Sequence, residues 1–252
     1  ERRLAFQVLK PKYEHIQQHT GGLKLQLFEH SDKRFKKGRK LMRHKRSKKQ
    51  ESAKKKRRML GMPLTFDWRT HGFVTPVKNQ GTCGGCYCFS AIDHLEYWWK
   101  KKTGNLTELS IQECLDCTRE KIHMADGCDG GLMEDVYTMS SRWPIGEKKF
   151  DQFVMRDRFC PRRPPNVGIK VKSFETMSDE WHSPIESQLA HNLIRHGPIP
   201  VGIDSKSYNF ELYKKGILKK SDCGREIDHA VTVVGFGVEH GTRYWIVKNS
   251  WG

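Results

Sequence analysis

The sequence has no apolar run that approaches the roughly 20 consecutive residues needed to cross a membrane as a helix. We therefore expect no membrane-spanning segment among these residues. The chain begins with Glu1, and no charged, apolar and small-residue signal segment follows that residue. An export signal, if the protein uses one, is expected to lie outside these residues.

Acidic residues are nearly missing from one stretch of the sequence. Residues 33–58 contain 16 Lys or Arg and a single acidic residue, Glu51, so they supply +15 of the formal net charge of +17. Residues 59–252 contain 25 basic and 24 acidic residues and are close to neutral. Because the basic tract has almost no apolar side chains to bury, we expect a solvated linker. The bulk of the chain lacks the charge typical of a nucleic-acid-binding domain.

Three residues with complementary chemistry stand in order along the chain. Cys86 follows Cys-Gly-Gly, His229 lies in Asp-His-Ala-Val, and Asn249 lies in Lys-Asn-Ser-Trp-Gly. A nucleophilic thiol needs a neighbouring base or cation, and that base needs an orienting partner. Cys86, His229 and Asn249 supply these three roles, with His229 143 residues and Asn249 163 residues after the cysteine.

Further motifs accompany these three residues. They are Phe66-Asp-Trp-Arg69, Leu109-Ser110, Asp116-Cys117, Gly127-Cys-Asp-Gly-Gly131 and Gly235-Phe-Gly237. With them, the chain from about Leu64 to Gly252 resembles the papain-like cysteine peptidases, the group that includes cathepsins L, S and K. Two positions depart from the family pattern, since Gly85 replaces a usual Ser and Tyr87 a usual Trp. We expect these changes to reduce activity rather than abolish it.

The resemblance implies an α+β fold of two lobes, one helical and one resembling an antiparallel β-barrel, with the active-site cleft between them. The local pattern agrees with this division. Apolar residues at helical spacing predict a helix from Cys86 to about Lys101, with the cysteine at its N-terminus. Short β-branched or aromatic runs predict strands at 200–203, 230–234 and 243–247.

The resemblance also assigns roles in peptide-bond hydrolysis. Cys86 would attack as a thiolate paired with the His229 imidazolium, and Asn249 would orient the imidazole. The side chain of Gln80 and the backbone N–H of Cys86 would form the oxyanion hole. Trp251 would shield the histidine–asparagine hydrogen bond from water, or would simply pack in the core. No metal or other cofactor is expected, since a zinc site at the clustered cysteines would need Cys86 itself.

Eight residues match positions that bind substrate in the family: Gly130, Gly131, Leu132, Met133, Gly202, Ile227, Ala230 and Trp251. Those matching the main specificity pocket are apolar or small, which favours an aliphatic or aromatic substrate side chain. Gly130 and Gly131 would allow close approach of an extended peptide, or would serve only the turn after Cys128. Proteins or peptides are the expected substrates, and the chain is expected to be a monomer.

The resemblance implies two disulfide bonds, Cys83–Cys128 and Cys117–Cys160. Such bonds indicate an oxidising compartment, so a lysosomal or extracellular location is expected. Cys223 would pair with a residue beyond Gly252. Cys88 and Cys114 lie outside the family set and are either two buried thiols or an additional bridge. Asn105, in Asn-Leu-Thr, is the one glycosylation sequon of the sequence.

The chain divides into three parts. Residues 1–32 resemble a partial, divergent inhibitory propeptide, with apolar residues at helical spacing up to about residue 20. Residues 33–62 form the basic linker or activation segment. Residues 63–252 form the peptidase domain, which would lack the C-terminal end and the pocket floor that family members usually have. We expect a cysteine endopeptidase made as a proenzyme and inhibited by its own propeptide. Two alternatives remain open, a catalytically weak homologue that binds polyanions and a fragment without function.

Three roles are open for the basic tract from Lys33 to Arg58. Its Lys55-Lys-Arg-Arg58 segment resembles a convertase cleavage site just ahead of Met62, which favours a processed activation segment. The tract could instead bind polyanions such as heparan sulfate or nucleic acid, or be merely a soluble insertion. A nuclear address also fits the composition, but it conflicts with the disulfide pattern.

If the tract binds polyanions, replacing the five basic residues from Lys54 to Arg58 with Gln should lower the salt concentration that elutes the protein from heparin. The reason is that fewer counterions are released when fewer positive charges bind the polyanion. Elution of the variant at the salt concentration of the unmodified protein would count against polyanion binding.

Overall fold

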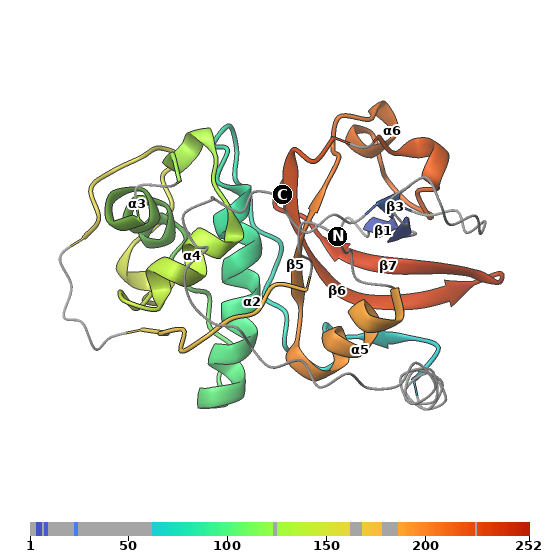
Figure 1. Cartoon of the computed structure of the whole chain (residues 1–252), viewed down its shortest axis with the longest axis horizontal. Helices are drawn as coiled ribbons and strands as arrows, with labels where there is room; N and C mark the ends of the chain where they lie inside the picture. Colours follow the sequence, from blue (N-terminus) through green and yellow to red (C-terminus); the bar gives the residue numbers. More distant parts are fainter. Residues whose placement is uncertain are drawn as a thin grey trace, which may run out of the picture.

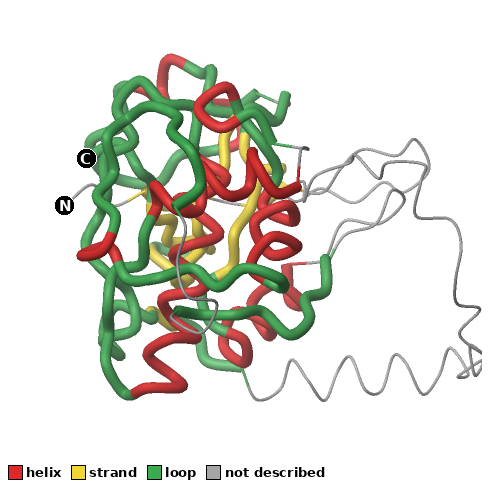
Figure 2. The backbone as a smooth tube through the Cα atoms, turned by 90° about the vertical axis from the view of Figure 1, so that its left-hand side faces the viewer, coloured by secondary structure: helices red, strands yellow, loops and turns green. Residues whose placement is uncertain are grey.

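The computed structural model describes residues 4–6, 8–9, 23–24, 62–122, 125–161, 168–177, 186–224 and 226–252. A helical lobe lies beside a lobe built on an antiparallel sheet (Figure 1). Figure 2 is seen from the helical side, so the helices lie in front of the strands. Each lobe has its own apolar core. The expected α+β fold of two lobes is therefore confirmed.

The described part of the helical lobe contains three helices around one core. They are α2 (Cys86–Thr103), α3 (Ile111–Ile122) and α4 (Met133–Ser140), with two short 3₁₀ helices, η2 (Gly127–Asp129) and η3 (Lys148–Phe150). The residues Phe89, Ile92 and Leu95 of α2 are buried, as their spacing of three predicts for one face of a helix. Two disulfide bonds, Cys83–Cys128 and Cys117–Cys160, close this lobe as the resemblance implied.

The second lobe is organised around β6 (His229–Glu239), the longest of the strands that the structure describes. It pairs on one side with β7 (Thr242–Lys248) and on the other with β5 (Ile199–Ile203) and β4 (Phe66–Asp67), all antiparallel. The predicted strands at 200–203, 230–234 and 243–247 fall inside β5, β6 and β7. Two helices, α5 (Glu186–His196) and α6 (Tyr208–Glu211), and the 3₁₀ helix η4 (Lys220–Asp222) complete the described part of this lobe.

The N-terminal segment differs from the predicted helix at the residues that the structure describes. Residues Leu4–Phe6 form β1, which pairs antiparallel with β7, and Val8–Leu9 form β2, which pairs in parallel with β3 (Leu23–Lys24). The edge of β7 offers N–H and C=O groups to any neighbouring chain, and this pairing overrides local helical spacing. The rest of the propeptide-like segment and the whole basic tract lie outside the described residues.

Helix α2 contributes to both cores and so joins the lobes. Ile92 is buried in the helical core, whereas Tyr97 packs in the sheet lobe with its ring centroid 4.9 Å from that of Trp68. The indole N–H of Trp68 donates to the carbonyl of Leu193 on α5 at 2.8 Å. Ala230 of β6, a strand of the sheet lobe, packs in the core of the helical lobe. None of the helices that the structure describes has the length and apolar character to span a bilayer.

His94 of α2 makes polar contacts with two side chains of the helical lobe. Its Nε2 accepts from the Trp98 indole N–H at 2.9 Å, and its Nδ1 lies 2.8 Å from the Tyr137 hydroxyl of α4. A neutral ring with its proton on Nδ1 satisfies both contacts. Burial lowers the pKa of His94 to about 4.

We expect His94 to make the fold sensitive to acid. An unfolded histidine has a pKa of about 6.5, so the neutral ring contributes its full stability above that pH. The contribution is lost as the pH falls from about 6.5 toward 4, at on the order of 1.4 kcal/mol per pH unit. Urea denaturation between about pH 7 and pH 5 should show a steeper loss for the unmodified protein than for His94→Gln. Substitution of the exposed His71 by Gln is the control, and equal slopes in all three proteins would contradict the expectation.

Candidate active site

Cys86 is the first residue of α2, and its sulfur lies against the start of β6. The free N–H groups of a helix N-terminus carry partial positive charge, which favours a thiolate there. Burial raises the pKa of the Cys86 thiol, while a hydrogen bond from the backbone of Ala230 opposes that rise. Since Ala230 directly follows His229, the two lobes meet at the thiol.

His229 and Asn249 are brought together by neighbouring strands. His229 is the first residue of β6, and Asn249 directly follows β7. The His229 Nε2 lies 2.7 Å from the Asn249 Oδ1, which also accepts the backbone N–H of Ser250 at 2.8 Å. Because that oxygen is an acceptor in both contacts, Nε2 is the ring nitrogen that donates. The other nitrogen, Nδ1, is then available for proton exchange.

Trp251 covers the imidazole. Its ring stacks on His229 with centroids 4.9 Å apart and an interplanar angle of 30°, and the ring of Phe210 meets Trp251 edge-on at 5.3 Å. His229 is only 4% exposed. Burial lowers the pKa of His229, whereas the hydrogen bond to Asn249 and the charge of Asp228 oppose this. Trp251 thus packs against His229 and Phe210, and its role in shielding the histidine–asparagine bond stays a prediction.

Gln80 is held in one orientation by hydrogen bonds at both ends of its side-chain amide. Its Nε2 donates to the Cys83 carbonyl at 3.0 Å, and its Oε1 accepts from the Ser250 hydroxyl at 2.5 Å. The Gln80 backbone N–H also donates to the Ser250 carbonyl at 2.8 Å. An amide nitrogen has two N–H groups, so the Cys83 bond uses only one of them. Sequence reasoning missed the role of Ser250, although the residue lies inside the Asn-Ser-Trp-Gly motif.

The residues predicted to bind substrate fall into two groups, one on each lobe. Gly130, Gly131 and Leu132 connect η2 to α4, which begins at Met133, while Gly202, Ile227 and Ala230 lie around the start of β6. Gly202 pairs with Ala230 across β5 and β6, beside the pair of Ile203 with His229. Met133 and Ala230 are 3% and 2% exposed and belong to the same core. They therefore expose little side-chain surface in this structure.

Gly130 has backbone angles of φ 126° and ψ 175°, which only glycine adopts readily. A side chain built there would meet no atom within 4 Å, so the outer side of this residue is open. The other reading of the two glycines, a role in the turn after Cys128, also fits Gly130. The ring of Tyr87 packs against Gly131 next to it.

The two departures from the family pattern fit their surroundings. Tyr87 is fully buried, and its hydroxyl donates to the carbonyl of Gly127 at 3.3 Å. Gly85 directly precedes α2, and a Cβ placed on it would lie 3.0 Å from the Cδ1 of Leu115 on α3. The space of the missing side chain at Gly85 is therefore taken by Leu115.

Four cysteines of the described chain are thiols: Cys86, Cys88, Cys114 and Cys223. Cys88 and Cys114 are fully buried in the helical core, where their side chains hydrogen-bond to one another. Burial and the neighbouring Asp222 and Asp204 raise the pKa of Cys223 to about 12. Within the described ranges, no three His, Cys, Asp or Glu side chains are grouped so that they could hold a metal ion.

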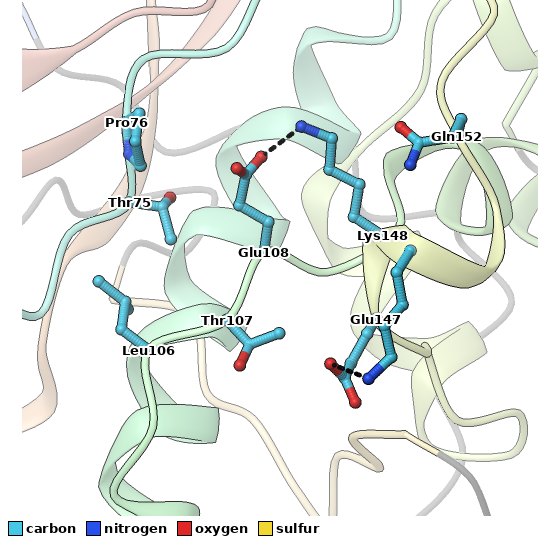
Figure 3. Close-up of a pocket in the computed structure, with 9 residues that line it drawn as sticks. Thr75, Pro76, Leu106, Thr107, Glu108, Glu147, Lys148 and Gln152 are labelled. Carbon is cyan, nitrogen blue, oxygen red and sulfur yellow. Dashed lines mark hydrogen bonds and ion pairs between the residues drawn. The ribbon is translucent and has the colours of Figure 1, made fainter.

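A groove of about 380 Å³ lies away from the predicted catalytic residues (Figure 3). Its lining residues are Thr75, Pro76, Leu106, Thr107, Glu108, Glu147, Lys148, Lys149 and Gln152. Ion pairs of 2.8 Å between Lys148 and Glu108, and of 3.1 Å between Lys149 and Glu147, line it. Asn105 of the sequon is exposed and directly precedes this lining. We therefore place the candidate active site at Cys86 and not in this groove.

The chain is similar to proteins of one known family. The family model described as papain family cysteine protease matches residues 62–252. Cathepsin K of Gallus gallus is 36% identical over 193 residues, which are 75% of this chain and 55% of that protein. Cathepsin L2 of Homo sapiens is 37% identical over 199 residues, which are 77% of this chain and 58% of that protein.

A solved structure is also similar. It is the crystal structure of the Amb a 11 cysteine protease, a major ragweed pollen allergen, in its proform. The sequence identity is 32% and the TM-score 0.66, and the match covers 76% of this chain and 56% of that one. The chain therefore spans a little over half the length of these relatives.

We expect Gly85→Ala to destabilise the protein by about 1–3 kcal/mol, because the new methyl group would press on Leu115 in a packed core. Leu115→Val removes volume at that contact. In its presence, Gly85→Ala should destabilise the protein less. Urea denaturation of both single variants and the double variant would give the coupling energy. Strictly additive effects would show that Leu115 does not set the requirement for glycine.

Proposed function

The chain belongs to the papain family of cysteine proteases, and we propose that it is an endopeptidase in which Cys86 and His229 hydrolyse peptide bonds. The observation that carries the proposal is the bond of 2.7 Å between His229 and Asn249, beside a cysteine at the start of a helix. A thiol, an oriented imidazole and a helix N-terminus are the groups that thiol-based peptide hydrolysis requires.

The reaction proceeds in two halves. The Cys86 sulfur attacks the carbonyl carbon of the peptide, a C–S bond forms, and the carbonyl oxygen becomes an oxyanion. The C–N bond then breaks, and His229 gives its proton to the leaving amine, which yields an acyl-enzyme. Water attacks this thioester with His229 as base, and the C–S bond breaks. The acid product leaves, and the thiol of Cys86 is regenerated.

The oxyanion would be stabilised by two N–H groups. One is the backbone N–H of Cys86, which lies in the first turn of α2, where N–H groups have no partner within the helix. The other is the Gln80 amide N–H that does not bond to Cys83. Because Ser250 and Cys83 hold both ends of this amide, little reorganisation is needed when the oxyanion forms.

The charge state of the catalytic pair depends on two opposing effects. Burial raises the pKa of Cys86 and lowers that of His229, so desolvation alone favours a neutral thiol and a neutral imidazole. Opposite charges at close range attract more strongly in a site of low dielectric, and the helix N-terminus adds to this. We therefore expect the proton to move from sulfur to imidazole so that both groups become charged together.

The substrate is expected to bind as an extended peptide between the two groups of lining residues. Gly130 and Gly131 would admit the peptide backbone, and Leu132, Met133, Gly202, Ile227 and Ala230 would line the main pocket with Trp251 near the scissile bond. This lining favours an aliphatic or aromatic substrate side chain, because it offers no charged partner.

The same family resemblance supports synthesis as a proenzyme. Residues 1–32 would be a partial inhibitory propeptide, 33–62 an activation segment cleaved at its basic residues, and 63–252 the peptidase domain. The two disulfide bonds favour an oxidising compartment, and the secretory route to a lysosome or the cell exterior supplies one. On that route the exposed Asn105 would be glycosylated. The mature enzyme is expected to act as a monomer.

One observation favours a second function. The charge concentrated in residues 33–58 would bind polyanions whether or not the peptidase domain is active. A catalytically weak homologue that holds polyanions through this tract is therefore the alternative, and the heparin experiment addresses it.

The test of the proposed function is labelling of the full-length protein, after proteolytic processing at its basic segment, with an epoxide inhibitor of papain-like proteases at acid and neutral pH. Mass spectrometry should find one inhibitor per chain, and Cys86→Ala should remove it. Cys223→Ala is the matched control, since it removes another partly exposed thiol and should leave labelling unchanged. Asn249→Ala should slow labelling between about ten- and a hundredfold, because it removes a hydrogen bond to a charged ring. Absence of labelling, or labelling that persists in Cys86→Ala, would refute the proposal.

A further inference from the structure

Four charged side chains are buried together where the two lobes meet. Lys78, Asp93, Glu96 and Lys248 have side-chain exposures of 9%, 9%, 1% and 5%. The group contains two ammonium and two carboxylate groups, so its charges balance. Asp93 and Glu96 belong to α2, Lys248 ends β7, and Lys78 lies in the segment between β4 and α2.

Asp93 is the member of this group that contacts both lysines most closely. Its Oδ1 accepts from Lys78 at 2.6 Å and from Lys248 at 2.7 Å, and its Oδ2 accepts from the Thr232 hydroxyl of β6 at 3.3 Å. Although burial opposes it, the two ammonium groups hold the pKa of Asp93 below its ordinary value. The carboxylate therefore stays charged at neutral pH.

Glu96 and Thr75 complete the group. Glu96 Oε2 accepts from Lys78 at 2.8 Å and from the Thr75 hydroxyl at 2.5 Å, while its Oε1 accepts the backbone N–H of Leu109 at 2.9 Å. The Thr75 hydroxyl accepts from both lysines at 3.0 Å. Each ammonium group therefore has at least two oxygen partners, as buried charges require.

Each segment that meets at Asp93 carries a group of the proposed active site. Lys248 directly precedes Asn249, and Lys78 lies two residues before Gln80. Asp93 follows Cys86 on α2 by seven residues, which is about two turns of the same helix face. The segments of Asn249, Gln80 and Cys86 are thus attached to one carboxylate.

Other contacts join only two of these three segments. Gly252 donates its backbone N–H to the Lys78 carbonyl at 3.1 Å, and Gln80 donates to the Ser250 carbonyl at 2.8 Å. These bonds tie the Gln80 segment to the Asn249 segment, but neither involves α2. The bonds of Asp93 to Lys78 and Lys248 connect both segments to the helix that carries Cys86, and the bond of Glu96 to Lys78 is a further link between that helix and the Gln80 segment.

We propose that Asp93 is a positioning residue, which fixes the helix bearing Cys86 relative to the His229–Asn249 pair and to Gln80. This inference rests on the proposed function, because it assigns Asp93 a part in the same site. Stability alone is a weak explanation of the cluster, since well-packed apolar residues often replace buried ion pairs without loss of stability. Charged hydrogen bonds have defined lengths and directions, which apolar contacts do not provide.

The experiment measures inactivation by the epoxide inhibitor in the same processed protein, separating the maximal rate, kinact, from the binding constant, KI. Asp93→Asn keeps the shape of the side chain and removes its charge. We expect kinact to fall at least about tenfold, since even a small misplacement of reacting groups has this effect, while KI changes less than about twofold. A kinact within about twofold of the unmodified protein would overturn the proposal.

Two further variants separate positioning from stability. Asp116→Asn removes another buried carboxylate, which accepts from Gln112 and Arg158 within the helical lobe, and it should leave kinact unchanged even if it lowers Tm. The double variant Asp93→Leu with Lys248→Met replaces an ion pair by an apolar pair. We expect it to recover Tm relative to Asp93→Asn but not kinact, and recovery of both would refute a positioning role.

A readout independent of activity separates this inference from the proposed function. If the unmodified protein is not labelled, the proposed function fails. The side-chain amide NMR signals of Asn249 and Gln80 then decide the role of Asp93. Shifts of these signals in Asp93→Asn but not in Asp116→Asn would uphold positioning, and unshifted signals would overturn it.

Discussion

The Asp93 carboxylate lies at the junction of two lobes with separate apolar cores, where it bonds to lysines from the segments that carry Gln80 and Asn249. Burial of apolar surface pulls the lobes together but is non-directional, so it leaves their relative register to side-chain packing. Hydrogen bonds to a buried charge restrict both distance and direction. The helix that carries the thiol and the strands that carry the imidazole are therefore aligned by polar contacts between lobes, in addition to the packing within each.

The same burial imposes a conflict at the reacting groups. His229 is almost fully covered by Trp251 and its neighbours, and the thiol of Cys86 lies between the lobes, so water stabilises neither charge well. The site counters this with the partial charge of the α2 N-terminus and with Asn249, whose amide oxygen faces the ring. These groups oppose the effect of burial and favour the thiolate and imidazolium that the proposed mechanism uses.

Gly85 and Tyr87, which flank Cys86 and depart from the family pattern, both fit the packing of the helical lobe. At position 85 the backbone is closely approached by Leu115, and at position 87 a tyrosine uses its hydroxyl to hold the carbonyl of Gly127. Both contacts link the start of α2 to the rest of the helical lobe. The loop that precedes α4 and the helix that carries Cys86 are consequently packed as one unit, together with the Cys83–Cys128 bond.

The sequence by itself determined the local elements and the candidate catalytic residues. Helical spacing located α2 with Cys86 at its first residue, β-branched runs located β5, β6 and β7, and motif order selected His229 and Asn249 as candidates. These features depend on neighbours in the chain and on residue type, which a sequence displays directly. Only the tertiary structure decided which residues that lie far apart in the sequence are in contact. The pairing of β1 with β7, the contact of Gly85 with Leu115, and the meeting of Lys78 and Lys248 at Asp93 have no local signal. A buried charge is recognisable only through the partners that surround it in the folded chain, because an isolated lysine or aspartate in a sequence looks the same whether it is solvated or buried.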